Sequence, residues 1–415
     1  MASTDAIRAH FPALQRTWNG HTVAYFDAPG GTQVPRAVAE AMTDYLFHHN
    51  ANTHWAYPTS EETDAILLGA REACADLLNA EPGEIAFGNN MTSLTFHLAR
   101  TLGRTWRPGD EVVVTELDHH ANVDPWLALE RDFGMVVRKV RMIPATAQLD
   151  YGHMASLMTA KTRLVAVGGA SNATGTMNDL ARVRAIASEA LLFVDAVHLA
   201  PHERIDVKAI GCDFLACSSY KFYGPHAGIL FGREELLASL PFPKVAPAPD
   251  TAPERVETGT QNHEGIAGIR AVIDWLASLS EGETRRDCLA STFDAFHARG
   301  ERLFRMLWDG LSSIDGITLY GPRPGQPRTP TVAFTAQGVD CEVLVRELAT
   351  QGLFVSHGDF YAATAIERLG VPEVVRVGCA CYSTEEEIER LVEGVRMSDA
   401  LRKSNRSAGS GLAIK

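Results

Sequence analysis

The chain lacks an apolar run long enough to cross a membrane, and it lacks an excess of basic residues. Hydrophobic residues fill 46% of its 415 positions and charged residues 21%, which is typical of a soluble globular protein. The formal net charge is −13. Because nucleic-acid binding relies on Lys and Arg side chains that neutralise phosphates, this balance argues against a nucleic-acid partner. We therefore expect a small substrate, with neither nucleic acid nor a membrane as partner.

The start of the sequence, MASTDAIRAHFPALQR, lacks a basic segment followed by an apolar core, so we expect no secretion signal and a cytoplasmic protein. Zinc-ligand spacings of Cys and His are also missing, and no metal is predicted. An odd number of scattered cysteines favours reduced thiols over a disulfide framework. These seven are Cys74, Cys212, Cys217, Cys288, Cys341, Cys379 and Cys381.

A chain of this length exceeds what one hydrophobic core supports, so two domains are expected. Between about residues 85 and 232, short β-branched runs alternate with amphipathic ones. This alternation is typical of a mostly parallel sheet covered by helices. The predicted strands are Ile85–Phe87, Glu111–Thr115, Met135–Val140, Arg163–Gly168, Leu191–Asp195, Asp213–Cys217 and Ile229–Phe231.

The Pro- and Ala-rich stretch 241–255 reads as a surface loop and indicates a nearby domain boundary. Beyond it, helical patterns at about 265–310 and 342–350 and strands near 331–334 and 374–379 predict a smaller α+β domain. We assign the chain to an N-terminal segment that packs with the small domain (1–20), a large cofactor-binding domain (21–262), a small C-terminal domain (263–398) and a disordered tail (399–415).

Polar residues follow several of these strands, where ligands of open α/β sheets bind. Asp195 ends the apolar run LLFVD, and a buried acid there would keep a pyridine nitrogen protonated. Lys221 follows another strand, where partial desolvation lowers a lysine pKa as Schiff-base chemistry requires. The Ser218 hydroxyl could bind a phosphate. A lysine for an aldehyde, an acid for a pyridine nitrogen and a phosphate donor are the groups that pyridoxal phosphate requires. When each residue is considered alone, an alternative remains: Asp195 could cap the following turn, and Lys221 could be a solvated surface charge.

Five blocks, in order, resemble the class V aminotransferases of fold type I, specifically the cysteine desulfurase-like group. They are TELDHHANVDPW, GASNATGTMNDL, LFVDAVHLAPH, FLACSSYKFYGPHAGILFG and ETGTQNHEGIAGI. The resemblance covers about residues 20–395. It implies an α/β fold, that of a fold type I pyridoxal phosphate-dependent transferase, with a large, mostly parallel seven-stranded sheet domain and a smaller α+β C-terminal domain. It also implies pyridoxal 5'-phosphate as cofactor, a homodimer and a small amino acid as substrate.

The resemblance implies a role for each matching residue. Lys221 carries the cofactor as a Schiff base and removes a proton from the substrate Cα, while Asp195 holds the pyridine nitrogen. His119 stacks on the pyridine ring and assists proton transfer. Asn172 and His198 hydrogen-bond the ring hydroxyl. Taken alone, His119 is as readily a solvated loop residue and Asn172 a turn former.

The cofactor phosphate needs donors of its own. The segment Gly88–Ser93 opens a predicted helix, and amides at a helix N-terminus bind phosphate without a positive side chain. We assign Thr92 and the Met91 amide to this site, with a plain helix cap as the alternative. The resemblance implies that Thr260 reaches the phosphate of the neighbouring subunit, which requires a homodimer.

The substrate is expected to meet three segments. Arg376 matches the family arginine that grips the substrate carboxylate, a task suited to its bidentate fork, although a solvent-facing strand arginine is the alternative. The stretch around Ala28 and the residue His54 resemble loops that close over the amino acid. Tyr361 is assigned to the same substrate site.

Two positions depart from the desulfurase pattern. Gly358–Ala362 aligns with the loop that carries a mobile persulfide cysteine, yet Tyr361 stands where the thiol would be and none of the seven cysteines lies there. Tyr220 replaces the histidine that precedes the lysine, which alters the acid/base set. The sequence therefore predicts a pyridoxal phosphate enzyme that works through a Cα carbanion, a desulfurase-like Cβ lyase without the persulfide cysteine. A class V aminotransferase, an epimerase and a non-catalytic cofactor-binding scaffold stay open.

Overall fold

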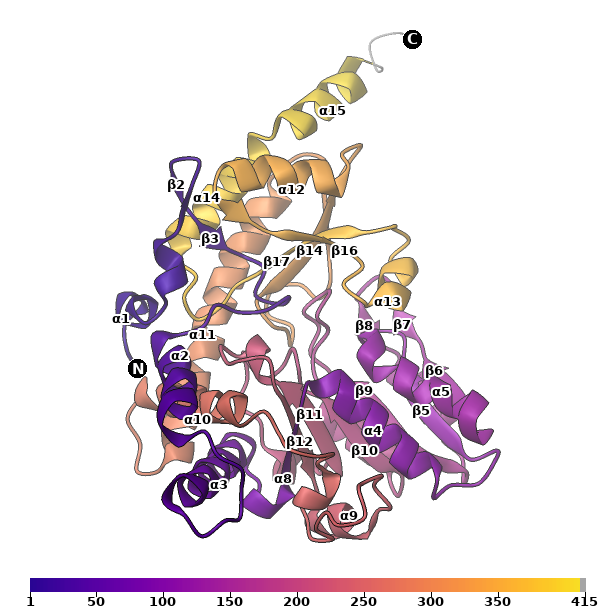
Figure 1. Cartoon of the computed structure of the whole chain (residues 1–415). Helices are drawn as coiled ribbons and strands as arrows, with labels where there is room; N and C mark the ends of the chain where they lie inside the picture. Colours follow the sequence, from indigo (N-terminus) through magenta and orange to yellow (C-terminus); the bar gives the residue numbers. More distant parts are fainter. Residues whose placement is uncertain (411–415) are drawn as a thin grey trace.

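The computed structural model describes the backbone of residues 1–410 and the side chains of residues 1–404. Figure 1 shows a large domain in the lower half of the view and a smaller one above it. No helix of the described chain is long and apolar enough to cross a membrane.

A seven-stranded sheet forms the centre of the large domain, in the order β4-β12-β11-β10-β9-β5-β6. Within this sheet only β12 runs antiparallel to its neighbours. The middle strands are buried on both faces, as their runs of branched and aromatic side chains require. The bounds are β4 Ile85–Gly88, β5 Glu111–Thr115, β6 Val136–Val140, β9 Thr162–Gly168, β10 Leu191–Asp195, β11 Phe214–Ser218 and β12 Gly228–Gly232. The predicted α/β fold and its large sheet are confirmed, and each predicted strand lies within two residues of an observed one.

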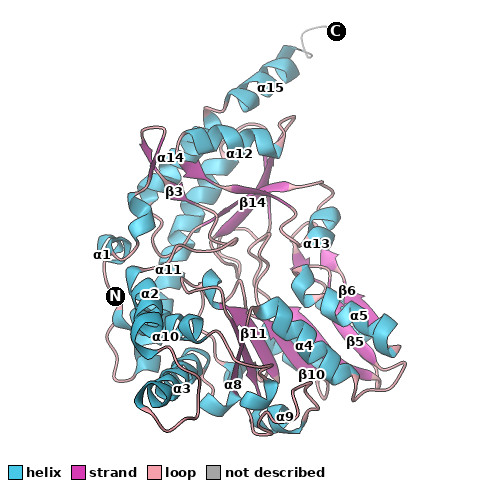
Figure 2. Cartoon of the chain, viewed as in Figure 1, coloured by secondary structure: helices cyan, strands magenta, loops and turns pink. Residues whose placement is uncertain are grey.

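Helices cover the large sheet (Figure 2). They are α2 Arg36–Asp44, α3 Pro58–Leu78, α4 Met91–Gly103, α5 Asp124–Phe133, α6 Tyr151–Leu157, α7 Leu180–Ala187, α8 Val207–Ile210, α9 Glu234–Ser239 and α10 His263–Ser278. A short hairpin, β7 (Met142–Ile143) and β8 (Gln148–Leu149), extends from the end of β6.

The small domain contains an antiparallel sheet in the order β13-β14-β17-β16. Its strands are β13 Ile317–Tyr320, β14 Thr331–Ala336, β16 Ser356–Gly358 and β17 Val374–Gly378. The accompanying helices are α11 Arg285–Ser312, α12 Cys341–Thr350, α13 Ala363–Arg368 and α14 Glu385–Arg396. Thr284 and Thr384 begin α11 and α14 with reciprocal capping boxes, which satisfy the first free amides of each helix.

The N-terminal segment contacts both domains. Its elements are α1 Thr4–Ala9, the hairpin of β1 (Thr17–Trp18) and β2 (His21–Thr22), and β3 Ala24–Tyr25, which pairs with β15 (Leu353–Phe354). Arg8 pairs with Glu387 of α14 at 2.9 Å. Phe11 packs edge-on against Trp275 of α10 and against Tyr382.

The small domain was expected to begin at residue 263, where α10 starts. Helix α10 instead packs against α2 and α3, and its buried residues share the core of the large sheet. The described contacts therefore group α10 with the large domain. We propose that the boundary lies in the turn between α10 and α11.

The disordered tail predicted from residue 399 onward needs a correction. Residues Asp399–Ser410 form helix α15, which projects from the top of the molecule in Figure 1, and only residues 411–415 lie outside the described chain. Two contacts fix its start: Leu401 is 1% exposed in the small-domain core, and the Ser398 hydroxyl donates to Glu347 at 2.6 Å. One buried leucine is too weak a periodic signal to be seen in a polar sequence.

A buried ion pair ties the segment before α10 to the sheet. Arg71 on α3 makes two bonds to Glu257, at 2.9 and 3.0 Å, and also donates to the Ile85 carbonyl at 2.6 Å. The Phe87 amide donates to the same carboxylate at 2.9 Å. Both side chains are almost fully shielded from water.

Removing Arg71 should therefore strand a buried carboxylate. We expect Arg71→Ala to lower the free energy of unfolding by about 3–5 kcal/mol, measured by urea denaturation. Arg131→Ala is the matched control, because Arg131 pairs with Asp132 at an exposed position and its loss should leave the midpoint in place. Equal midpoints for Arg71→Ala and the native chain would contradict this role for the pair.

Candidate active site

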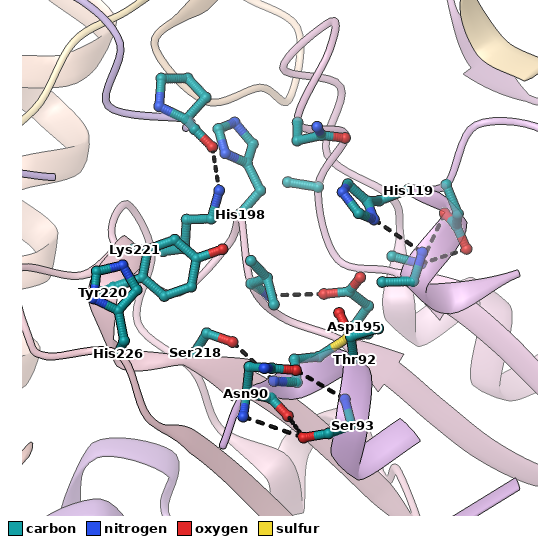
Figure 3. A pocket seen from close by; sticks show the side chains of 18 of the residues that line it. Asn90, Thr92, Ser93, His119, Asp195, His198, Ser218, Tyr220, Lys221 and His226 are labelled. Atoms are coloured by element: carbon teal, nitrogen blue, oxygen red, sulfur yellow. Dashed lines mark hydrogen bonds between the residues drawn. The ribbon is translucent and has the colours of Figure 1, made fainter. Parts of the chain in front are cut away.

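A cavity of about 620 Å³ opens beyond the carboxyl ends of the large-sheet strands. Figure 3 shows Lys221 and Tyr220 on one side of it, His119 on the other and Asp195 between them. Eight of the residues predicted from sequence line this cavity: Met91, Thr92, His119, Asn172, Asp195, His198, Ser218 and Lys221. Such a cavity is large enough for a cofactor-sized ligand.

Lys221 ends a 3₁₀ turn, Ser219–Lys221, that directly follows β11. Its Nζ donates to the carbonyl oxygens of Pro29 at 2.6 Å and Gly30 at 3.1 Å. Burial, together with the nearby positive charge of Arg376, lowers the pKa of Lys221 to about 8. The amine is thus a far better nucleophile near neutral pH than a surface lysine.

Two buried carboxylates lie at the ends of β10 and β5. Asp195 accepts from the Val197 amide at 2.9 Å, and burial raises its pKa to about 6, so it is mostly ionised at pH 7. Asp118 accepts from the Gly168 amide at 3.0 Å and from Asn122 at 2.9 Å. Burial, with a smaller contribution from the charge of Asp195, raises the pKa of Asp118 to about 7. A cationic ring nitrogen between them would relieve this crowding of negative charge.

His119 is held as a neutral ring. Its Nδ1 accepts from the Ala121 amide at 2.9 Å. Burial, followed by the charge of Lys221, lowers the pKa of His119 to about 4. A neutral, fixed imidazole on the wall of the cavity is suited to stacking on a flat ligand.

The N-terminus of α4 forms one end of the cavity. Asn90 caps the helix by accepting from the Ser93 amide at 2.9 Å, and Ser93 reciprocates. The Met91 amide donates to the Ser218 hydroxyl at 2.9 Å, so these two predicted phosphate ligands lie side by side. This approach requires Gly228 on β12, since a Cβ there would lie 2.6–2.8 Å from the Asn90 backbone. The helix dipole and its first amides favour an anion at this point.

Asn172 and His198 lie on a further wall. Asn172 donates from Nδ2 to the Phe360 carbonyl at 2.9 Å, while its buried Oδ1 has no hydrogen-bond partner in the described chain. The ring of His198 contacts the hydroxyls of Thr329 and Thr331 at 3.0 and 3.1 Å. Burial lowers the pKa of His198 well below its usual value, so this ring is neutral.

The predicted substrate residues lie outside the cavity lining. Arg376 on β17 is only 3% exposed and donates to the Asn172 carbonyl at 3.0 Å. Ala28 is buried in the same turn as Pro29. Tyr361 is 73% exposed, and its ring lies 5.5 Å from the ring of His119. Arg376 and Tyr361 are thus neighbours of the cavity rather than part of its wall.

Thr260 and His54 lie elsewhere on the chain. Both line a second cavity, of about 580 Å³, which shares no lining residue with the first. Within one chain the structure therefore does not bring these two residues to Lys221. A role in an active site would have to be in that of another subunit.

Sequence reasoning missed four residues around the cavity: Asp27, Asp118, His226 and Phe360. Asp118 follows a buried strand just as Asp195 does, so the same rule of polar residues at strand ends could have found it. Asp27, whose Oδ1 has no partner among the described residues, lies next to Ala28 in the stretch assigned to the substrate loops. His226 stacks on Tyr220 with ring centroids 4.8 Å apart. Nothing in the sequence marks Phe360, because its role depends on a contact across the fold.

The chemistry of this donor set fits pyridoxal phosphate. A lysine amine of lowered pKa, an ionised carboxylate, a neutral imidazole and an anion-binding helix N-terminus surround one cavity. The unpartnered Asn172 Oδ1 gives a ring hydroxyl an acceptor. Each of these groups matches a part of the cofactor.

The class V aminotransferase family model matches residues 24–391. The chain belongs to the class V aminotransferase family. Enzymes of this family depend on pyridoxal 5'-phosphate, so the cofactor and enzyme class expected from the sequence are confirmed.

Curated relatives place the chain within the cysteine desulfurase-like part of the family. It is 32% identical over 409 residues to a cysteine desulfurase of Dickeya dadantii, covering 94% of this chain and 95% of that protein. A probable cysteine desulfurase of Vibrio cholerae is 31% identical over 414 residues, covering 95% and 98%.

Solved structures agree. A cysteine desulfurase of Thermococcus onnurineus, solved in the apo form, has a TM-score of 0.86 at 26% identity, and covers 95% of this chain and 98% of its own. A cysteine desulfurase of Escherichia coli has a TM-score of 0.83 at 28% identity with the same coverage. The resemblance identified from five sequence blocks is confirmed.

The lowered pKa of Lys221 predicts how the protein captures its cofactor. Only the neutral amine attacks an aldehyde, so the rate of capture by cofactor-free protein should rise with pH through about 8, not near the ordinary 10.5. The change in absorbance on adding pyridoxal phosphate measures this rate. Borohydride reduces the imine to a stable amine, so after this treatment Lys221→Ala should carry no covalently attached cofactor. A midpoint near pH 10 would contradict the buried environment of the amine.

Proposed function

We propose that this protein cleaves a substituent from Cβ of a small amino acid, without an enzyme persulfide. The observation that carries the proposal is the convergence of Lys221, Asp195 and the α4 N-terminus on one cavity in a chain of this family. Pyridoxal phosphate, when bound, withdraws electrons from the substrate Cα. The chain's own residues supply binding, orientation and proton transfer.

Lys221 is the proposed base that removes the proton from Cα. Its pKa of about 8 keeps a usable fraction of neutral amine near neutral pH. Asp195, mostly ionised at pH 7, would hold the cofactor's ring nitrogen in its protonated form by charge pairing. His119, neutral because burial lowers its pKa to about 4, would stack on the cofactor ring without adding a positive charge.

Arg376 is the proposed partner of the substrate carboxylate. Gly30 lies between it and Lys221: the Gly30 carbonyl accepts from Lys221 Nζ at 3.1 Å, and a Cβ on Gly30 would lie 3.4 Å from Arg376 Nη2. The positive charge of Arg376 also contributes to the lowered pKa of Lys221. Burial lowers the pKa of Arg376 to about 9, partly opposed by the charge of Asp27. A carboxylate bound there would neutralise a buried cation that Asp27 only partly compensates.

The absence of an enzyme persulfide is supported by where the cysteines lie. Tyr361 stands in the loop Gly358–Ala362, and no cysteine belongs to that loop. Six of the seven cysteines are buried, and Cys288 on α11 is partly buried. Burial also raises the pKa of Cys379 and Cys381 to about 12, which leaves their thiols unreactive. We therefore propose that the fragment on Cβ leaves without a covalent intermediate on an enzyme thiol, while Cβ takes up a proton to give alanine. A carboxylate would leave as carbon dioxide, and an acyl group would pass to water. Sulfur or selenium would pass at the zero-valent level to a small external thiol.

A homodimer completes the proposal. Thr260 and His54 share a cavity that is separate from the one at Lys221, and the Arg71–Glu257 pair fixes the segment leading to Thr260. Exposed apolar side chains lie nearby in the chain, among them Phe47, Trp55 and Leu68. Such a surface is typical of a subunit interface, and we propose that it presents Thr260 to the partner's phosphate site.

A screen of amino acids against the holoenzyme tests the reaction. We expect a change in absorbance with an amino acid that carries a leaving fragment on Cβ, and mass spectrometry should find alanine and the released fragment. Lys221→Ala should lower turnover roughly 100- to 10,000-fold, while the exposed Lys161→Ala serves as control. A keto acid product would indicate transamination, an inverted Cα would indicate epimerisation, and no spectral change with any amine would indicate a scaffold.

Subunit complementation tests the shared site. We expect Lys221→Ala and Thr260→Ala to bind pyridoxal phosphate weakly when each is alone. In a mixed dimer one site combines Lys221 of one subunit with Thr260 of the other. Random reassociation should therefore restore tight binding at about a quarter of all sites, measured by equilibrium titration. No restoration after verified subunit exchange would contradict the proposed dimer geometry.

A further inference from the structure

The loop between β16 and α13 lies directly on the proposed carboxylate-binding arginine. The ring of Phe360 stacks over the Arg376 guanidinium, with Cζ 3.7 Å from the ring centroid. The edges of the guanidinium are also engaged: Nη1 donates to the Asn172 carbonyl at 3.0 Å and Nη2 donates to Ser356 Oγ at 3.3 Å. Arg376 does not line the cavity of about 620 Å³.

The same loop is anchored to the large domain. The Phe360 carbonyl accepts from Asn172 Nδ2 at 2.9 Å, and the Tyr361 carbonyl accepts from the His120 amide at 2.7 Å. Beyond the loop, Arg368 on α13 pairs with Glu116 of the large domain. Figure 1 shows α13 where the small domain meets the large one. The loop is thus a strap across the two domains, over the arginine.

The strap is held in an unfavourable backbone conformation. Phe360 and Tyr361 both have positive φ, of 57° and 56°, in the left-handed region. Consecutive bulky residues rarely adopt this region, because their Cβ atoms crowd the backbone there. A strained segment kept in place by a few contacts at a ligand site is the kind of element that has a second arrangement.

Arg376 itself lacks full compensation where it lies. Its Nε has no hydrogen-bond partner among the described side and main chains, and the buried Oδ1 of Asp27 has none either. The Phe360 ring offers only its π face to the cation. A carboxylate offers full charge and two acceptors, so it is the stronger partner for a buried guanidinium.

We propose that Phe360 gates Arg376 and thereby determines which carboxylates the enzyme accepts. In the resting enzyme the ring shields the guanidinium, and the substrate carboxylate exchanges with it as the strap moves. A carboxylic acid without an amino group gains too little binding free energy to displace the ring. An amino acid is also held through its amine, so its binding is strong enough. This inference rests on the proposed role of Arg376 in binding substrate.

Chemical modification of the holoenzyme with phenylglyoxal, an arginine-selective reagent, tests the gate. Peptide mass spectrometry gives the rate at each arginine. We expect Phe360→Ala to raise the rate of modification at Arg376 roughly 5- to 30-fold. This factor corresponds to the loss of one cation–π contact that is partly to fully shielded from water. Propionate should slow the modification of Arg376 far more in Phe360→Ala than in the native enzyme, because propionate can bind the guanidinium once the ring is removed.

Two matched controls separate gating from loosened structure. Tyr361→Ala alters an exposed ring in the same strap and should leave the Arg376 rate unchanged. Arg328 is an internal reference, since it is buried under Phe304 with Cζ 3.6 Å from the ring centroid, and its rate should stay constant in every variant. If the rate at Arg328 rises in Phe360→Ala, that variant has loosened the structure, and Phe360→Leu, which removes the ring but keeps an apolar side chain, is measured instead. A rate at Arg376 in Phe360→Leu equal to that of the native enzyme would show that Phe360 does not gate Arg376.

Arg376→Ala separates the two levels of the argument. If it leaves the amino-acid-induced spectral change at native affinity, Arg376 does not bind the carboxylate and the proposed function loses that role. The other outcome is that Arg376→Ala weakens binding of the amino acid while Phe360→Ala neither exposes Arg376 nor strengthens propionate binding. In that case Arg376 binds the carboxylate as proposed, and only the gating role of Phe360 is wrong.

Discussion

Burial of charge at the carboxyl ends of one parallel sheet is the constraint on which this active site depends. Lys221, Asp195 and Asp118 lie at these strand ends, and Arg376 approaches them from β17 of the small domain. Each is largely shielded from water and has a pKa displaced toward its neutral form. No single ion pair resolves the cost, since the charges are spread around a cavity. A cofactor with a cationic nitrogen, an anionic phosphate and an aldehyde supplies partners for most of them.

The fold brings these groups together by backbone geometry more than by side-chain contacts. The parallel strands β5, β9, β10 and β11 end at the same edge, so residues far apart in the chain face one space. The antiparallel β12 brings Gly228 beneath the start of α4, and the missing Cβ lets the helix N-terminus reach Ser218. The phosphate end of the cavity is therefore a property of how α4 sits on the sheet.

The small domain adds a buried cation and the loop that covers it. It contributes Arg376 from β17 and the strap of Phe360 and Tyr361, and both act on the cavity from outside its wall. The strap presents the ring of Phe360 to the buried guanidinium of Arg376. On the proposed reading, this loop bears on what the site transfers and admits, whereas the cofactor-binding residues lie on the large sheet.

The sequence by itself determined the sheet, its strands and the residues at the strand ends, because β-branched runs and the polar residues that follow them are local signals. It also determined the family, since five blocks in order are far more specific than any one residue. Tertiary structure alone decided that α10 packs with the large domain and that Leu401 anchors a terminal helix. It likewise separated Thr260 and His54 from Lys221, and placed Phe360 on Arg376. Each of these is a contact between distant segments, and such contacts leave no periodic or compositional trace along the chain.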